Sequence, residues 1–184
     1  TITIGAAYLT TLDTIDGGTG GTDTLTIATA AATLADADFT NVTNIEALTF
    51  SVASSNTDLG AEYVESGSST ITLTTGTNDL NLDSVTTAQT LNLVAGTDTI
   101  DASSMTGALT VKYAVSNDLN SSEDTITAGT SLNDVLQLTY SGAAAALNGV
   151  TNFETIKGGS NLAQTITTVD ANVAATKSLT VDMT

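Results

Sequence analysis

The sequence predicts an all-β protein, and within that class a parallel β-solenoid. Threonine is the commonest residue, at 39 of 184 positions, and β-branched side chains favour strands. Apolar and polar residues alternate in short runs such as residues 70–74 (Thr-Ile-Thr-Leu-Thr), which is the two-residue period of a strand. Pairs of such runs recur after 18 to 20 residues, a length that suits one coil of a solenoid.

The composition limits the classes of partner. Twenty acidic residues stand against three lysines and no arginine, which gives a net charge of −17. Nucleic acid is excluded as a partner because phosphate binding needs clustered basic residues. We recognise no signal-peptide pattern and no apolar segment long enough to insert into a membrane in these residues, and we expect any targeting signal to lie outside them. The apolar fraction of 41% is high enough for a core, so the acidity does not indicate disorder.

We expect a single elongated β domain over residues 1–184, with an internal duplication of segments 12–50 and 123–158. The sequence Asp-Thr-Ile at 13–15 recurs at 124–126, and Thr-Asp-Thr-Leu at 22–25 corresponds to Asn-Asp-Val-Leu at 133–136. Further on, Val-Thr-Asn-Ile-Glu at 42–46 matches Val-Thr-Asn-Phe-Glu at 150–154. Strand-like residues at 1–4 and 179–183 predict a module of a longer protein.

Shorter units fill the rest of the chain, at 79–93, 98–111 and, more weakly, 164–181. We expect these units to stack as coils about 4.8 Å apart, with the Asp-Thr-Ile segments in register. Residues 143–147 are interpreted as a helical turn. The alternation predicts a buried core of Ile15, Leu25, Ile27, Val42, Ile45, Leu48, Ile71, Leu73, Leu80, Leu82, Leu91, Leu93, Ile100, Leu109, Val111, Ile126, Leu136, Leu138, Val150, Ile156, Ile166, Leu179 and Val181.

An antiparallel β-sandwich is the alternative fold. A sandwich normally carries more aromatic residues than the three Phe and four Tyr of this chain. The solenoid is therefore the preferred prediction.

The segment 13–25 reads Asp-x-Ile-x-Gly-Gly-x-Gly-Gly-x-Asp-x-Leu. Glycines allow tight turns that aim backbone carbonyls inward, and aspartates add the hard oxygen ligands that calcium prefers. The segment resembles the Gly-Gly-x-Gly-x-Asp nonapeptide of RTX calcium-binding β-rolls over about one and a half units, with Gly21 as an extra residue. The resemblance implies a calcium site made by Asp13, Asp16, Gly17, Thr19, Gly20 and Asp23.

Two further segments are candidate calcium sites. The second duplicated unit offers Asp124, Asn133 and Asp134, with Ala128-Gly129 in place of Gly17-Gly18. The Asp-Thr-Ile-Asp run offers Asp98 and Asp101. The alternative for the glycine-rich turn and for the second duplicated unit is a turn without an ion. The alternative for Asp98 and Asp101 is polar capping of a coil. Glu46 and Glu154 recur at equivalent positions and are interpreted as turn-bonding groups.

The run at 17–25, followed by Phe-x-x-Val-Thr-Asn-Ile-Glu-x-Leu at 39–48, resembles bacterial surface-layer proteins and large calcium-dependent adhesins exported by type I secretion. This resemblance implies an extracellular, cell-surface protein that assembles with copies of itself in a lattice. It also implies bound Ca²⁺, and contact with cell-surface polysaccharide through other domains. The alternative is a repeat module of a large secreted adhesin.

Catalysis finds no support in the sequence. Without His or Cys, neither a Ser-His-Asp triad nor a Cys-His pair can form, so we expect no enzyme. A remote alternative is binding to ice or another crystal surface by the Thr-x-Thr segments, whose irregular spacing argues against a continuous flat face. Those segments are 24–26, 72–74, 97–99, 125–127 and 165–167.

Overall fold

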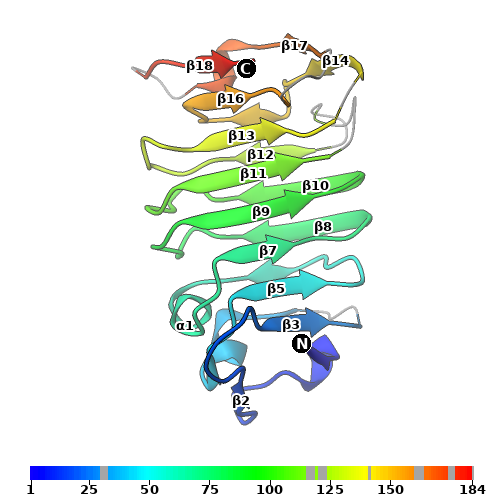
Figure 1. The fold of residues 1–184 in the computed structure, drawn as a ribbon, viewed down its shortest axis with the longest axis vertical. Helices are drawn as coiled ribbons and strands as arrows, with labels where there is room; N and C mark the ends of the chain where they lie inside the picture. The colour runs from blue at the N-terminus through cyan, green and yellow to red at the C-terminus, as the bar shows by residue number, and fades with distance from the viewer. Residues whose placement is uncertain are drawn as a thin grey trace.

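A computed structural model shows a tall stack of parallel coils, a β-solenoid (Figure 1). It describes residues 1–29, 33–114, 119, 124–140, 142–159, 164–173 and 177–183. Glu123, the predicted start of the second duplicated segment, lies outside these residues. Among the described residues, no helix is long and apolar enough to cross a membrane.

Short strands make up most of the ordered chain. The strands are β1 (Ile2–Ile4), β2 (Ile15–Asp16), β3 (Thr24–Ile27), β4 (Val42–Thr43), β5 (Ala47–Phe50), β6 (Thr57–Asp58), β7 (Thr70–Thr72), β8 (Gly76–Asn81), β9 (Gln89–Leu93), β10 (Gly96–Asp101), β11 (Leu109–Tyr113), β12 (Thr125–Thr127), β13 (Val135–Leu138), β14 (Gly142–Ala146), β15 (Val150–Thr151), β16 (Thr155–Lys157), β17 (Gln164–Thr167) and β18 (Thr180–Asp182). The described helices are α1 (Ala61–Glu65) and three 3₁₀ turns, η1 (Ala6–Tyr8), η2 (Asp36–Phe39) and η3 (Asp170–Asn172).

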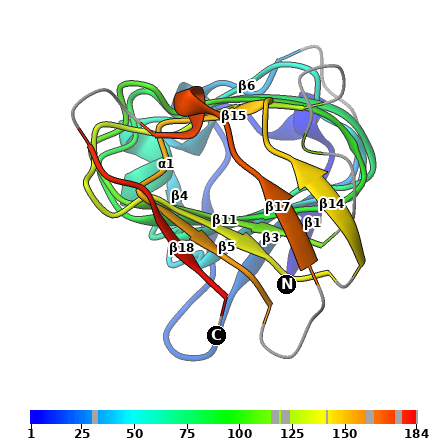
Figure 2. The same cartoon turned by 90° about the horizontal axis from the view of Figure 1, so that it is seen from above.

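Two parallel sheets form the long faces of the stack. The nine-stranded sheet has the order β1-β3-β5-β7-β9-β11-β13-β16-β18, and the five-stranded sheet has the order β15-β12-β10-β8-β6. Seen along the stack, the two sheets lie on opposite sides of the core (Figure 2). The strand pairings of the described residues are parallel, so the antiparallel sandwich is wrong.

The predicted register is confirmed for two of the three Asp-Thr-Ile segments, whereas Ile15 of the first segment pairs with Val42 in a separate two-stranded sheet. Thr99 pairs with Thr125 and Ile100 with Ile126, so residues 98–100 lie directly beside residues 124–126. The shorter units also stack as expected, because Thr77 pairs with Thr97 and Leu91 with Val111. Differences in coil length fall in the turns, and the strands therefore stay aligned.

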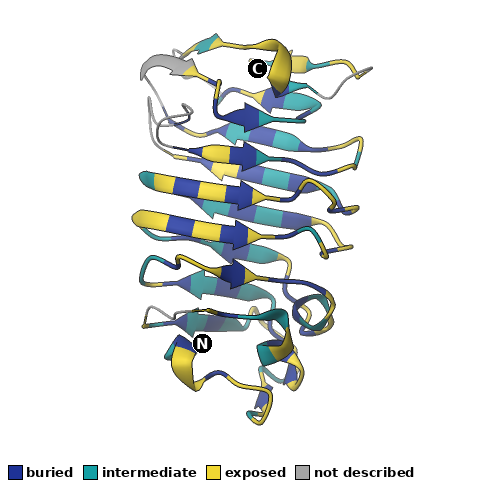
Figure 3. Ribbon diagram, turned by 180° about the vertical axis from the view of Figure 1, so that it is seen from behind, coloured by how far each residue is buried: buried dark blue, intermediate teal, exposed yellow. Residues whose placement is uncertain are grey.

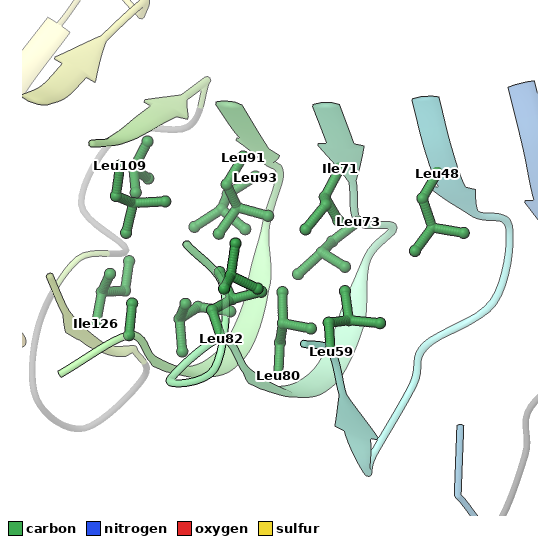
Figure 4. Close-up of a cluster of buried hydrophobic side chains, with 14 of the residues drawn as sticks. Leu48, Leu59, Ile71, Leu73, Leu80, Leu82, Leu91, Leu93, Leu109 and Ile126 are labelled. Carbon is green, nitrogen blue, oxygen red and sulfur yellow. The ribbon is translucent and has the colours of Figure 1, made fainter. Parts of the chain in front are cut away.

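The core lies between the two sheets, where their inward side chains meet (Figure 4). Of the predicted core residues, most are buried. Ile166 and Leu179 are only partly buried, and Val181 is 47% exposed because β18 is an edge strand of the nine-stranded sheet. The alternation did not identify the buried aromatic residues, which lie in short helices, in loops or at strand ends: Phe39, Phe50, Tyr63, Tyr113, Tyr140 and Phe153.

The two segments interpreted as a duplication contain equivalent strands. In the first, β2 pairs with β4 and β3 with β5; in the second, β12 pairs with β15 and β13 with β16. Asn44 and Asn152 occupy equivalent positions and are the two non-glycine residues with positive φ in the described chain, at 55° and 65°. Asn tolerates this left-handed conformation better than most residues. The helical turn predicted at 143–147 is wrong, because residues 142–146 form β14, which pairs with β17.

Candidate functional site

Two aspartates precede the glycine-rich turn at residues 17–22, and each bonds backbone close to it in sequence. Asp13 Oδ2 accepts hydrogen bonds from the Thr10 amide at 2.8 Å and from Thr10 Oγ1 at 2.9 Å. Asp16 Oδ1 accepts from Asn44 Nδ2 at 2.7 Å and from the Gly18 amide at 2.8 Å, and these two bonds lower the pKa of the Asp16 carboxyl. Both candidate ligands therefore already have turn-forming roles.

Glycines shape this turn in two ways. Gly18, Gly20 and Gly21 have positive φ and open space around them, and such backbone suits glycine. Gly17 instead packs against the next coil, because a Cβ there would lie 1.9 Å from the Asn44 carbonyl oxygen. Thr19 and Gly20 are exposed at the tip of the turn.

Asp23 joins its coil to the next one through Glu46. The Asp23 amide donates to Glu46 Oε2 at 2.6 Å, and the Asp23 carbonyl oxygen accepts from the Glu46 and Ala47 amides at 3.0 Å each. Because Thr24 pairs with Ala47, Asp23 and Glu46 occupy the same position on neighbouring coils. Glu46 therefore bonds the backbone of the preceding coil and not its own turn.

The second repeat reproduces this arrangement around Asp134 and Glu154. The Asp134 amide donates to Glu154 Oε2 at 3.0 Å, and the Asp134 carbonyl oxygen accepts from the Glu154 amide at 3.2 Å. The Asp134 carboxylate also reaches the preceding coil, where its Oδ1 accepts from the Leu109 amide at 2.7 Å. Leu109, Asp134 and Glu154 thus form one interlocked column at the start of the nine-stranded sheet.

Asp134 carries a strongly perturbed carboxyl group. Its side chain is fully buried, and its Oδ2 has no hydrogen-bond partner. Burial raises the pKa of Asp134 to about 6; the Leu109 and Gly129 amides oppose the rise, and the charge of Glu154 adds to it. A buried carboxylate oxygen without a partner is costly, so this group gains from a proton or a cation.

A second buried polar column runs along the start of the five-stranded sheet. Asn78 Oδ1 accepts from the Ser54 amide at 3.0 Å, Asp98 Oδ1 from Asn78 Nδ2 at 2.7 Å, and Asp124 Oδ1 from the Asp98 amide at 2.8 Å. The Tyr113 hydroxyl donates to Asp124 Oδ2 at 2.9 Å. Each side chain therefore bonds a neighbouring coil, and the described contacts of Asp98 and Asp124 are those of a coil-linking column.

The remaining candidates are exposed, Asp101 at the end of β10 and Asn133 in a turn. Asp101 Oδ1 accepts from the Ser103 amide at 3.0 Å, and the Asn133 amide donates to Ser131 Oγ at 3.2 Å. The eleven predicted ligands thus divide among residues 13–23, two buried columns and these exposed positions. Within the described residues, no group of three or more carboxylates converges. The calcium assignments stay predictions, with Asp134 Oδ2 the oxygen best suited to gain a charged partner.

Sequence reasoning missed the linking roles of Ser54, Asn78, Tyr113, Glu46 and Glu154. A signal was available for part of this set. Asn78 and Asp98 are 20 residues apart, which is the coil length read from the neighbouring strands. The partners of Tyr113 depend on side-chain packing across the core, which periodicity does not encode.

The Thr-x-Thr segments are distributed over different sheets. Residues 24–26 and Thr72 belong to the nine-stranded sheet, whereas 97–99 and 125–127 belong to the five-stranded sheet and 165–167 to β17. Other threonines complete an aligned outward row on the nine-stranded sheet, where Thr26 pairs with Thr49 and Thr49 with Thr72. The row is more regular than the sequence spacing suggested, because the length differences fall in the turns.

The comparisons with known proteins add no family. Neither the protein-family models, nor the curated proteins, nor the solved structures give a match to this chain. The arguments on function below therefore use the site and surface of this chain alone.

Proposed function

We propose that this protein is a structural module of a bacterial surface layer, which assembles with copies of itself and is stabilised by calcium. The observation that carries the proposal is the stack of in-register parallel strands with its two larger sheets on opposite sides. Main-chain and side-chain hydrogen bonds link successive coils along this stack. Such a body offers extended, repetitive faces for packing against identical neighbours.

The charge of the chain supports a requirement for cations. At −17, each copy repels its neighbours and its own segments, so dense packing needs counterions. Extracellular calcium sites typically have dissociation constants of about 10⁻⁴ to 10⁻³ M. At a few millimolar calcium, each occupied site then adds on the order of 1 kcal/mol to the free energy of unfolding.

The test compares calcium with sodium on the purified chain. Millimolar calcium should raise the melting temperature and produce ordered sheets in electron micrographs, and a chelator should reverse both effects. Sodium at equal ionic strength screens charge without occupying sites, so its effect should be much smaller. Equal effects of the two salts would contradict the bound-calcium proposal.

The same experiment separates a surface layer from an adhesin repeat. An adhesin module is expected to gain thermal stability with calcium and yet stay monomeric. A separate assay of ice recrystallisation tests the remote alternative: inhibition by the purified chain would favour the outward threonine row as a crystal-binding surface.

A further inference from the structure

The outward face of the nine-stranded sheet is unlike the rest of this acidic molecule. Along the described strands β3 to β16, its outward positions hold no carboxylate, whereas the chain has twenty. Two of the three lysines lie there. Lys112 pairs with Gln137, and Gln137 with Lys157, so these three side chains form one straight line across β11, β13 and β16. We name them the lysine column; both lysines are exposed.

The opposite sheet has a matching line of opposite charge. On the five-stranded sheet, Asp58 pairs with Asn81 and Asn81 with Asp101. These three exposed side chains form the aspartate column on β6, β8 and β10. The alternation of buried and exposed residues on β8 and β10 is visible in Figure 3. Asp101 Oδ1 accepts a hydrogen bond from the Ser103 amide.

The two columns have the same spacing and opposite charges. In each, two charged residues are separated by one amide residue and by two strand steps, about 10 Å at 4.8 Å per step. Opposed face to face, lysine meets aspartate at both ends while Gln137 meets Asn81 in the middle. Because each column has the same order of charged, amide and charged residue from either end, the charges match whether the stacks of the two copies run parallel or antiparallel.

From this correspondence we infer that the nine-stranded face of one copy docks on the five-stranded face of the next, with the lysine column against the aspartate column. The inference rests on the proposed self-assembly and names the surfaces that perform it. Because the two faces lie on opposite sides of the molecule (Figure 2), the contact does not close on itself. Repetition of such a head-to-tail contact gives an open row of molecules.

The size of the contact predicts that each single pairing is weak. The strands of the five-stranded sheet contain two to six residues, and at about 3.3 Å per residue and 4.8 Å between strands they give a face of roughly 300 Å² per copy. The total of about 600 Å² lies below the range of stable dimers. Rows should therefore form cooperatively above a threshold concentration, without a long-lived isolated dimer.

One neighbour limits the strength of the lysine column. Asp182 on the edge strand β18 pairs with Lys157 and partly offsets its charge. Lys112 has no carboxylate beside it in the column, since its paired neighbours are Asn92 and Gln137. We therefore expect Lys112 to contribute more to docking than Lys157.

The experiment reverses the charge of one column at a time. The variants are Lys112→Glu with Lys157→Glu, and Asp58→Lys with Asp101→Lys, each assayed in millimolar calcium by sedimentation and electron microscopy. Each variant alone should need about tenfold more protein to assemble, because like charges then oppose at both ends. A 1:1 mixture should assemble like the wild type, since each altered face then meets its complement. Rescue by mixing also shows that both variants are folded.

Matched controls separate face pairing from general charge. Lys177→Glu and Glu65→Lys change the charge in the same two directions, by half as much as the double variants, at exposed positions outside both columns and should assemble like the wild type. The Asp→Lys variant is decisive, since it lowers the overall negative charge. General repulsion predicts that it assembles more readily than the wild type, whereas face pairing predicts that it assembles less readily.

The outcomes distinguish this inference from the proposed function. Assembly of the wild type with no effect of either reversal would overturn the pairing of these faces and leave the lattice proposal in place. Loss of assembly in the Lys→Glu variant alone would also overturn it, in favour of pairing between two nine-stranded faces. A wild type that stays monomeric at all calcium and protein concentrations would overturn both.

Discussion

Replacing Asp134 with asparagine should stabilise the calcium-free protein at neutral pH. The carboxyl group is fully buried, its Oδ2 has no hydrogen-bond partner, and its pKa is raised to about 6. Asparagine keeps an oxygen for the Leu109 amide, which Oδ1 accepts at 2.7 Å, and removes the buried charge. The substitution therefore changes the protonation chemistry while keeping the contact between coils.

The sign of the pH dependence follows from the direction of the shift. A group whose pKa is higher in the folded protein than in the unfolded chain favours folding when it is protonated. Its contribution is fully present below about pH 4 and is lost as the pH rises through about 6. A shift from 3.8 to about 6 corresponds to on the order of 2–3 kcal/mol, at about 1.4 kcal/mol per unit.

Urea unfolding of both proteins between pH 3.5 and 7.5, in the presence of a chelator, measures this difference. The gain in unfolding free energy of Asp134→Asn over the wild type should be smallest at the acid end and should reach on the order of 2 kcal/mol at neutral pH. Asp16→Asn is the matched control: Asp16 is exposed and its pKa is lowered, so its contribution is present at neutral pH and is lost as the pH falls. A constant difference for Asp134→Asn across the range would refute the reasoning.

Calcium makes the same variant a test of the metal hypothesis. A cation bound at Asp134 would hold the carboxylate ionised and stabilise the wild type at neutral pH. The advantage of Asp134→Asn should then shrink or reverse in millimolar calcium. If the advantage is unchanged by calcium, Asp134 is not a ligand and its role is to link coils.

Two backbone positions give further predictions. Gly17→Ala should lower the free energy of unfolding by about 1–3 kcal/mol, because the added Cβ would meet the Asn44 carbonyl oxygen; an unchanged free energy in urea unfolding would contradict the steric argument. Asn152→Val should cost about 1–2 kcal/mol because φ is 65°, whereas Asn152→Gly should be nearly neutral; similar melting temperatures for these two variants would show that the left-handed conformation is not the constraint.

The fold could be predicted because its determinants are local and repetitive. Alternation placed Leu25, Leu48 and Ile71 inward, and these residues do form one paired row in the core. The echo of Asp-Thr-Ile at 98–100 and 124–126 predicted neighbouring positions, which the register confirms. Strand direction followed from the coil length, since parallel strands need a long connection between them.

The candidate site was harder to predict, because its chemistry depends on which turns become neighbours. Asp98 and Asp134 lie in similar sequence contexts, yet they belong to columns on different sheets. Aspartate in a glycine-rich turn can ligate calcium, but it can also bond its own turn, as Asp13 and Asp16 do. The sequence pattern is the same in both cases, and only the three-dimensional contacts separate them.

The paired recurrence of aspartate and glutamate now has a physical explanation that does not require calcium. Asp23 and Glu46 are 23 residues apart, and Asp134 and Glu154 are 20 apart, so in both repeats the glutamate lies one coil beyond the aspartate. In both, the glutamate carboxylate accepts the aspartate amide, a charge-assisted bond that is stronger than a neutral one. This contact joins a particular coil to its successor, and a shift of either coil by one residue would break it. The most regular part of the motif therefore fixes the order and register of the stack. Any calcium-specific function must then come from the groups that differ between the repeats, namely the exposed glycine-rich turn beside Asp16 and the buried Oδ2 of Asp134.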